Sequence, residues 1–307
     1  MKLTVATCQF PVSADVAANC RYVLRQMRLA RERGADIAHF PEACLSGYAG
    51  VDFGSYREID WEQLREHTHE VLDLARQLEL WLVLGSSHQL SGRHKPHNSL
   101  YVVNDRGEIV DRYDKRFCAG DGSPDPRTGD LANYSPGNHF SVFSIGEVRC
   151  GALICHDYRY PELYRAYKAR GVDIVFHSYH AANVSKERMR AMRVYVGVHQ
   201  HSMSARATLP GITMPASMVA AAAANHLWIS CPNSSARESC WPSFAVRPDG
   251  VITGQLRLHV PGVLISTVDT AESLYDSTAA WRDRAMAGVL HSGKLVRDRR
   301  STDRTRL

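Results

Sequence analysis

Strand-like and helix-like segments alternate through the first part of the chain, and this alternation limits the folds open to it. Residues 2–10 are apolar on both faces, which is typical of a buried strand. Asp15 is a suitable cap for a helix over residues 15–33, and Gly34 ends that helical pattern. Residues 36–40 then form a second short apolar run. Repeated strand–helix units of this kind predict parallel strands covered by helices.

Hairpins become frequent later in the chain. A helical pattern over residues 61–80 leads into a strand at 81–85, and strands at 98–104 and 108–113 flank an Asp-Arg-Gly turn. Further strands are expected at 140–145, 148–154, 173–177, 227–231, 243–247, 251–255 and 263–269. Helices are expected at 161–170 and 186–201, and irregular segments at 117–136 and 205–215. This mixture predicts an α/β fold of packed sheets with helices outside.

Charge and hydropathy exclude several classes of protein. The 37 Lys and Arg against 32 Asp and Glu leave a formal net charge of +5, and five of the arginines crowd into residues 294–307. Without interleaved aromatic residues, that run is interpreted as a solvated tail rather than a nucleic-acid surface. The sequence has no apolar run of membrane-spanning length and no signal-peptide pattern at its start, so a cytoplasmic protein is expected.

The eight cysteines are scattered and form no Cys-x-x-Cys pair. A chain of this length without a secretion signal is expected to keep them reduced. Neither a zinc ribbon nor a thioredoxin-like site is therefore predicted.

The sharpest local feature is the segment Gly-Ala-Leu-Ile-Cys-His-Asp-Tyr-Arg-Tyr-Pro-Glu, which runs from Gly151 to Glu162. An apolar strand ends at Cys155, polar residues follow, and Pro161 opens a helix. A nucleophile on such a turn projects from the sheet edge and meets exposed backbone N–H groups, here that of His156. The competing interpretation is that Cys155 is a small buried hydrophobic residue.

A thiol nucleophile needs a base. His156, His177, His180 and the carboxylates are candidates, but His156 directly follows Cys155, so its side chain is expected to point elsewhere. A cysteine phosphatase is excluded, because Pro161 stands where that loop carries its arginine.

Glu42 and Lys115 are the other two candidates for catalysis. Glu42 ends an apolar strand, where partial loss of water raises the proton affinity of a carboxylate. Lys115 follows a hairpin strand and could stabilise an oxyanion beside a thiolate. Either residue alone would more often be a cap or a solvated surface group.

Taken together, these segments resemble the nitrilase superfamily of carbon–nitrogen hydrolases. Six pieces fall in the family's order over residues 2–269: Ala6-Thr7-Cys8-Gln9, Phe40-Pro41-Glu42, Tyr113-x-Lys115, Ser135-Pro136-Gly137, Ile154-Cys155-x-Asp157-x-Arg159-x-Pro161-Glu162 and Pro248-Asp249-Gly250. One such piece would carry little weight, whereas six in order are a specific signal.

The resemblance implies a four-layer α-β-β-α sandwich that pairs into a homodimer or a higher homo-oligomer. Residues 1–270 would form the hydrolase domain, and the tail at 271–307 would pack on a partner subunit. It also implies a triad of Glu42 as base, Lys115 as oxyanion stabiliser and Cys155 as nucleophile.

Asp130 stands where many members of this superfamily carry a further glutamate, so it is a candidate auxiliary acid. Tyr48, Arg159, His177 and His180 are candidates for the substrate pocket. Arg159 could meet a substrate carboxylate, but in this motif it is more often a structural salt-bridge partner.

Metal binding is a competing interpretation of the paired histidines. His177 and His180 have a suitable spacing, but the sequence places no third acidic or cysteine ligand with them. His67 and His69 are interpreted as exposed helix residues. No metal and no organic cofactor are expected.

The function that follows is hydrolysis of a small amide, N-carbamoyl compound or nitrile through a cysteine thioester. Amide or N-carbamoyl hydrolysis is favoured, because most of the superfamily performs it. Alternatives are a nitrilase, an acyltransferase using the same triad, or a catalytically silent scaffold. A scaffold would be expected to lose a member of the triad, and none is lost here.

Overall fold

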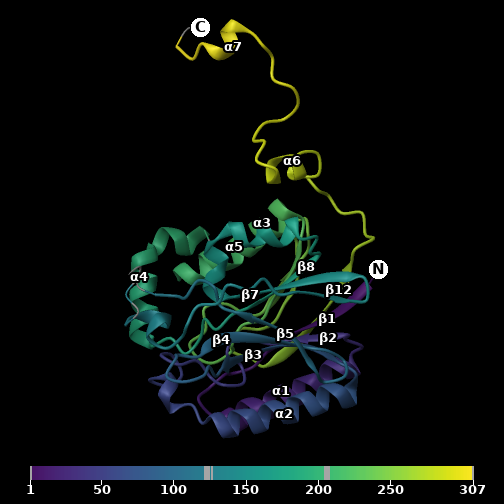
Figure 1. Ribbon diagram of the computed structural model, residues 1–307. Helices are drawn as coiled ribbons and strands as arrows, with labels where there is room; N and C mark the ends of the chain where they lie inside the picture. The colour runs from purple at the N-terminus through teal and green to yellow at the C-terminus, as the bar shows by residue number, and fades with distance from the viewer. Residues whose placement is uncertain (1, 121–124, 126, 204–207, 306–307) are drawn as a thin grey trace.

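Two six-stranded sheets form the centre of the molecule, as a computed structural model describes it for residues 2–120, 125, 127–203 and 208–305 (Figure 1). The strands of the first sheet are β1 (Lys2–Gln9), β2 (Ile37–His39), β3 (Trp81–His88), β4 (His97–Val103), β5 (Ile109–Asp114) and β12 (Gly262–Asp269). Their order is β12-β1-β2-β3-β4-β5. The three strands β1, β2 and β3 are parallel, and the outer strands pair with them or with one another in antiparallel fashion.

The second sheet repeats this plan. Its strands are β6 (Val142–Ile145), β7 (Val148–Ile154), β8 (Ile174–Ser178), β9 (Trp228–Cys231), β10 (Phe244–Val246) and β11 (Ile252–Gln255). They follow the order β11-β10-β9-β8-β7-β6, with β7, β8 and β9 parallel. In both sheets the parallel strands come from strand–helix units and the antiparallel ones from hairpins or long returns, as the mixed sequence pattern predicts.

Helices cover the outer face of each sheet. The long helices are α1 (Val16–Glu32), α2 (Trp61–Leu78), α3 (Pro161–Ala169), α4 (Lys186–Met203) and α5 (Leu209–Asn225). Helices α1 and α2 pack on the first sheet, whereas α3 and α5 pack on the second (Figure 1). The four-layer α-β-β-α sandwich is therefore confirmed.

Helix α5 corrects one prediction. Residues 205–215 were expected to be irregular, but the helix begins at Leu209 and continues to Asn225, while 205–207 lie outside the described residues. Thr208 caps it, and Pro210 occupies its first turn, where proline is tolerated. Pro215 removes one helical hydrogen bond, but the run of alanines that follows has the highest helix propensity, and the helix packs on α3 and β9.

A buried polar network joins the two sheets. The His39 ring, on β2, lies 2.8 Å from the hydroxyls of both Ser178 and Ser230, on β8 and β9. Ser230 also meets Thr7, on β1, at 2.7 Å. Because burial and the neighbouring His177 hold the pKa of His39 well below its usual range, the ring is neutral and can serve both hydroxyls.

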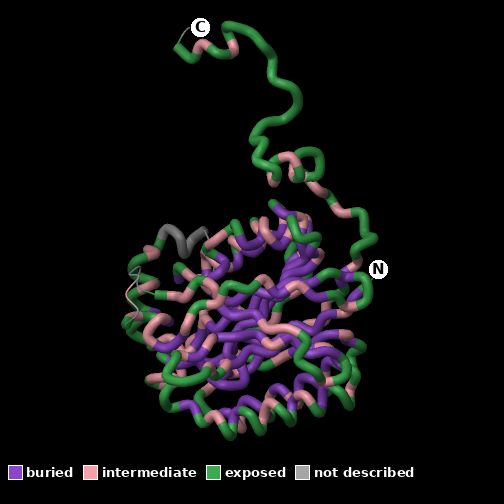
Figure 2. The backbone as a smooth tube through the Cα atoms, in the orientation of Figure 1, coloured by how far each residue is buried: buried purple, intermediate pink, exposed green. Residues whose placement is uncertain are grey.

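The C-terminal segment leaves the sandwich beside the N-terminus and extends away from it (Figure 1). It carries two short helices, α6 (Arg282–Met286) and α7 (Arg299–Thr302), and most of its residues are exposed (Figure 2). In the described part of the chain, no helix has both the length and the apolar character needed to cross a membrane.

Candidate active site

Three strand ends meet at one edge of the sandwich and carry the three candidate catalytic residues. Glu42 follows β2, Lys115 follows β5, and Cys155 follows β7 from the opposite sheet. Their exposed fractions are 0%, 1% and 7%. Only the packing of two sheets brings these distant segments together, and it removes nearly all of their solvent.

Two glycines allow the backbone to approach this closely. A Cβ atom on Gly137 would lie 2.5 Å from Asp114 Cβ, and one on Gly85 would lie 2.2 Å from the Pro41 carbonyl oxygen. The Gly137 N–H donates to the Lys115 carbonyl at 2.9 Å. Gly137 therefore lets its loop pass beside the Lys115 backbone, which explains the Ser-Pro-Gly piece of the sequence pattern.

The Lys115 ammonium is enclosed by oxygen atoms. Its Nζ lies 2.7 Å from Glu42 Oε1, 2.7 Å from Asp130 Oδ2 and 3.0 Å from the Tyr48 hydroxyl. Burial lowers the pKa of this lysine, but the carboxylates of Asp130 and Glu42 outweigh burial and hold it well above its usual range. The ammonium is therefore charged throughout the physiological pH range.

Asp130 lies on a short 3₁₀ turn, Gly129–Ala132, within the segment that was expected to be irregular. Besides Lys115, its carboxylate accepts hydrogen bonds from the Tyr48 hydroxyl at 2.6 Å and the Ala119 N–H at 2.7 Å. These three donors fix the carboxylate in place.

The two oxygens of Glu42 differ. Oε1 accepts hydrogen bonds from Lys115 and from the Asn98 amide, the latter at 2.8 Å. Oε2 is buried and accepts no hydrogen bond from the described residues. Glu42 Oε2 is thus the oxygen available to take a proton.

The Cys155 thiol is electrostatically coupled to this pair. Burial and then the Glu42 charge raise its pKa well above the usual value, whereas the Lys115 charge lowers it. Cys155 has a φ of 40°, a left-handed conformation that is unusual for a residue with a side chain. The backbone at this candidate nucleophile is therefore held in a strained turn, a conformation that is often found at functional sites.

Asp157 organises the turn that carries Cys155. Its carboxylate accepts hydrogen bonds from the Ile154 N–H at 3.0 Å, the Phe117 N–H at 2.9 Å and the Tyr113 hydroxyl at 2.8 Å. Burial raises the pKa of Asp157 to about 6, against these hydrogen bonds, which lower it. One carboxylate thus ties β7 to the segment that follows Lys115.

His177 lies beneath the same turn. Its Nε2 is 3.2 Å from the Cys155 carbonyl oxygen, its Nδ1 is 2.7 Å from the Tyr164 hydroxyl, and its ring stacks on Tyr179. Burial lowers the pKa of His177 to about 3, so the ring is neutral. The structure therefore places this candidate pocket residue behind the candidate nucleophile, in contact with its backbone.

His180 lies beside Tyr48, with ring centroids 5.4 Å apart, and its Nε2 is 3.1 Å from an Asp52 oxygen. Burial lowers the pKa of His180, but Asp52 outweighs burial and raises it above its ordinary value. Tyr48 in turn contacts Lys115, so His180 belongs to the same buried cluster as the candidate triad.

Arg159 and His156 lie on the other side of the turn. Arg159 is exposed, and its guanidinium stacks 4.7 Å above the Tyr158 ring. It lines a groove between α3 and α5, and none of the three candidate catalytic residues lines that groove. A place for Arg159 in the substrate pocket stays a prediction. The half-buried ring of His156 lies near Tyr158 and Tyr160, with ring centroids 6.5 and 6.0 Å away.

Sequence reasoning missed Asn98, Tyr113 and a role for Asp157. Asn98 lies on β4 and belongs to none of the six sequence pieces, so no motif pointed to it. Tyr113 and Asp157 both belong to the sequence pieces that carry the family resemblance. Their place beside Lys115 and Cys155 in those pieces was the signal available in the sequence. Their contact with each other depends on the pairing of the two sheets.

The chain belongs to the carbon-nitrogen hydrolase family, whose model matches residues 4–274. It is 28% identical to nitrilase homolog 2 of Dictyostelium discoideum over 162 residues, which are 52% of this chain and 48% of that protein. It is 27% identical to the omega-amidase NIT2 of Homo sapiens over 172 residues, 56% of this chain and 61% of that protein. The matched part of the chain thus spans about half to about three fifths of the length of these relatives.

Solved structures with the same fold include an amidase from Nesterenkonia sp., with a TM-score of 0.70 at 22% identity, covering 94% of this chain and 96% of that one. A variant of the amidase from Nesterenkonia sp. AN1 carries the acetamide moiety of fluoroacetamide added covalently at its active site cysteine; its TM-score is 0.68 at 22% identity, covering 86% of this chain and 90% of that one. At this identity the likeness establishes the fold.

Proposed function

We propose that this chain hydrolyses small amides or N-carbamoyl compounds through a thioester on Cys155. The observation that carries the proposal is the buried Lys115 ammonium between two carboxylates, Glu42 and Asp130, beside a thiol on a strained turn. A permanent cation, a carboxylate with one unengaged oxygen and a thiol are the three groups that acyl transfer needs.

The first half of the reaction forms the thioester. Glu42 Oε2 accepts the thiol proton, and Sγ of Cys155 bonds to the carbonyl carbon as the C=O electron pair moves onto oxygen. The Lys115 ammonium and the backbone N–H of His156 stabilise this oxyanion. When the intermediate collapses, the C–N bond breaks and the leaving nitrogen takes the proton from Glu42.

The second half releases the acid. Glu42 takes a proton from water, and the resulting hydroxide attacks the thioester carbon. The oxyanion again meets Lys115 and His156. Collapse breaks the C–S bond, and the sulfur recovers the proton that Glu42 holds, which returns the site to its starting state.

Asp130 and Tyr48 act in this scheme by holding Lys115. Two carboxylates keep the ammonium charged and fix its Nζ, so little reorganisation is needed as the oxyanion forms. Tyr48 and His180 are proposed to border the acyl group, since both lie within the buried cluster. A site whose catalytic groups are at most 7% exposed suits a small acyl group.

Nitrile hydrolysis and acyl transfer to an amine use the same thioester or thioimidate chemistry and remain the alternatives within this proposal. An amine in place of water as the second nucleophile would give transfer, and a nitrile would consume a further water before the acid is released. A silent scaffold is disfavoured, because Glu42, Lys115 and Cys155 are brought together.

We also propose a cytoplasmic homodimer or higher homo-oligomer, with residues 1–270 as the hydrolase domain and 271–307 packing on the partner. The eight free cysteines suit a reducing compartment. The groove between α3 and α5 has an apolar lining that includes Ala166, Ala169, Ala220, Ala221 and Ala224, and Met286 of this chain's own helix α6 borders it. Light scattering should give at least twice the chain mass, and Ala224→Arg, on the exposed face of α5, should reduce it; a monomeric wild type would refute this assembly.

Intact-protein mass spectrometry tests the function directly. The protein is incubated with a panel of small primary amides, N-carbamoyl amino acids and nitriles while ammonia is assayed. Ammonia release and an acyl adduct that maps to Cys155 are expected for at least one class. Turnover that survives in Cys155→Ala would refute the mechanism.

A further inference from the structure

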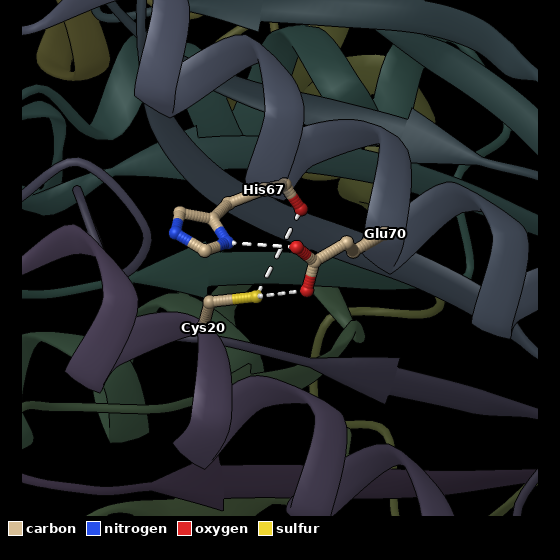
Figure 3. A group of neighbouring side chains, drawn as sticks. All are labelled: Cys20, His67 and Glu70. Atoms are coloured by element: carbon tan, nitrogen blue, oxygen red, sulfur yellow. Dashed lines mark hydrogen bonds and ion pairs between the residues drawn. The ribbon is translucent and has the colours of Figure 1, made fainter.

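A second cluster of chemically active side chains lies between the two outer helices α1 and α2, in a different layer from the candidate active site (Figure 3). Cys20 comes from α1, and His67 and Glu70 come from α2, three residues apart on one face. Among the described residues, these three offer ligand atoms that all lie within 4.8 Å of one another.

The side chains of this cluster lie close enough together to hold a metal ion. Cys20 Sγ is 3.8 Å from Glu70 Oε2, and His67 Nδ1 is 3.2 Å from Glu70 Oε1 (Figure 3). Tetrahedral zinc, with Zn–S near 2.3 Å and Zn–N and Zn–O near 2.1 Å, places sulfur about 3.6 Å from oxygen and nitrogen about 3.4 Å from oxygen. The two observed separations involve different oxygens of Glu70, so an ion would take both carboxylate oxygens or draw one of them toward Sγ and Nδ1 by a small side-chain rotation.

Ordinary hydrogen bonding does not account for the cluster. His67 Nδ1 is buried and, among the described residues, has no partner with hydrogen-bond geometry, although the Glu70 carboxylate is close to it. The Cys20 thiol has only long contacts, to Glu70 and to the His67 carbonyl oxygen at 3.9 Å. The buried imidazole nitrogen of His67 is thus left without a hydrogen bond, and the Cys20 thiol makes only long ones.

We propose that Cys20, His67 and Glu70 bind a divalent transition-metal ion of the zinc class, with water as the fourth ligand. A thiolate, a neutral imidazole and a carboxylate together balance the +2 charge. The burial of Cys20, 1% exposed, protects the thiolate, whereas the Glu70 side chain is 54% exposed and leaves room for water. Calcium and magnesium are disfavoured, because they select oxygen ligands.

A divalent ion at this place would stabilise the Cys20 thiolate directly. The ion would join α1 to α2 and so stabilise the helical layer over the first sheet, without a part in the reaction at Cys155.

Cobalt binding tests the site, because Co²⁺ replaces zinc and gives a thiolate charge-transfer absorption in the near ultraviolet. The wild-type protein, freed of metal by chelation and dialysis, is titrated with Co²⁺ and then with Zn²⁺. We expect a stoichiometric Co²⁺–thiolate absorption, its loss on displacement by Zn²⁺, and a higher Tm with Zn²⁺.

Variants locate the ligands. Cys20→Ser, His67→Gln and Glu70→Gln should each lower the affinity at least tenfold, the effect typical of losing a metal-site contact. Glu66→Gln, on the same exposed helix surface, Cys240→Ser and Cys155→Ala should bind as the wild type does. Because the Glu70 side chain is about half exposed, Glu70→Gln should fold normally. Its far-ultraviolet circular dichroism spectrum should therefore match that of Glu66→Gln, so that a loss of metal affinity is not a loss of folding.

Two results would overturn the proposal. One is the absence of a Co²⁺–thiolate absorption in the wild type, which would leave His67 and Glu70 as a plain ion pair. The other is an absorption that persists in Cys20→Ser and disappears in Cys155→Ala, which would assign the metal to the candidate active-site thiol. Neither result bears on amide hydrolysis.

Discussion

Asp130 Oδ2 lies 2.7 Å from Lys115 Nζ, as close as the carboxylate of Glu42 on the other side of the same ammonium. Asp130 is one methylene shorter than the glutamate that many nitrilase-superfamily members carry at this place. The 3₁₀ turn that holds it, with the Ala119 N–H bound to the same oxygen, brings the shorter side chain within reach. The shorter side chain thus still contacts the Lys115 ammonium.

Replacement of the thiol should separate catalysis from folding. Cys155→Ala removes the proposed nucleophile but keeps a small buried side chain, so turnover should fall to background while the Tm changes by only a few degrees. Ammonia release and thermal unfolding measure the two effects. Cys150 is another buried cysteine on β7, so Cys150→Ala is a matched control. It should remain active.

Neutralising Asp130 should weaken catalysis through Lys115. Asp130→Asn keeps the shape but leaves the ammonium with one carboxylate, so kcat should fall about 10–100-fold, less than the roughly 10²–10³-fold loss typical of removing an oxyanion donor outright. Tyr48→Phe, which removes a neutral contact to the same Nζ, should have a smaller effect. Equal activity of Asp130→Asn and the wild type would exclude a role for this carboxylate.

His177 should act by positioning the Cys155 backbone. His177→Phe removes the donor to the Cys155 carbonyl, and kcat should fall roughly tenfold, equivalent to about 1.4 kcal/mol, with KM nearly unchanged. His177→Gln can still donate and should recover part of the rate. A change confined to KM would instead indicate direct contact with substrate.

The same histidine predicts a loss of stability in acid. Burial lowers its folded pKa to about 3, so below its unfolded pKa near 6.5 the unfolded state binds the proton more readily. Its contribution is present above pH 6.5 and is lost as pH falls toward 3, by an amount of order 5 kcal/mol. Urea unfolding between pH 7 and pH 4 should show a steeper decline for the wild type than for His177→Gln.

Asp157 predicts the opposite trend. Burial raises its folded pKa to about 6, so the folded state holds the proton more tightly than the unfolded chain does. This contribution is full below about pH 4 and is lost as pH rises through 6, by about 3 kcal/mol. The stability of the wild type relative to Asp157→Asn should therefore decline between pH 4 and pH 7 in urea unfolding; a flat difference would show that Asp157 does not titrate there.

Local patterns in the chain predicted most of the elements. Asp15 caps α1 as expected, the apolar run that ends at Cys155 is β7, and Pro161 opens α3. These features depend on capping, periodicity and proline chemistry, which act over a few residues. Helix α5 was missed because Pro210 and Pro215 suggest a break, whereas packing against α3 and β9 compensates for the lost hydrogen bond.

The sequence by itself determined the class of fold, the family resemblance and the identity of the candidate triad, because each depends on residue types in a fixed order. Only the tertiary structure decided that Asp130 contacts Lys115, that Arg159 faces a different groove, and that His177 lies behind Cys155. It also brought Cys20 to His67 and Glu70. Such contacts join residues far apart in the chain, and their distances are set by how sheets and helices pack rather than by any local spacing.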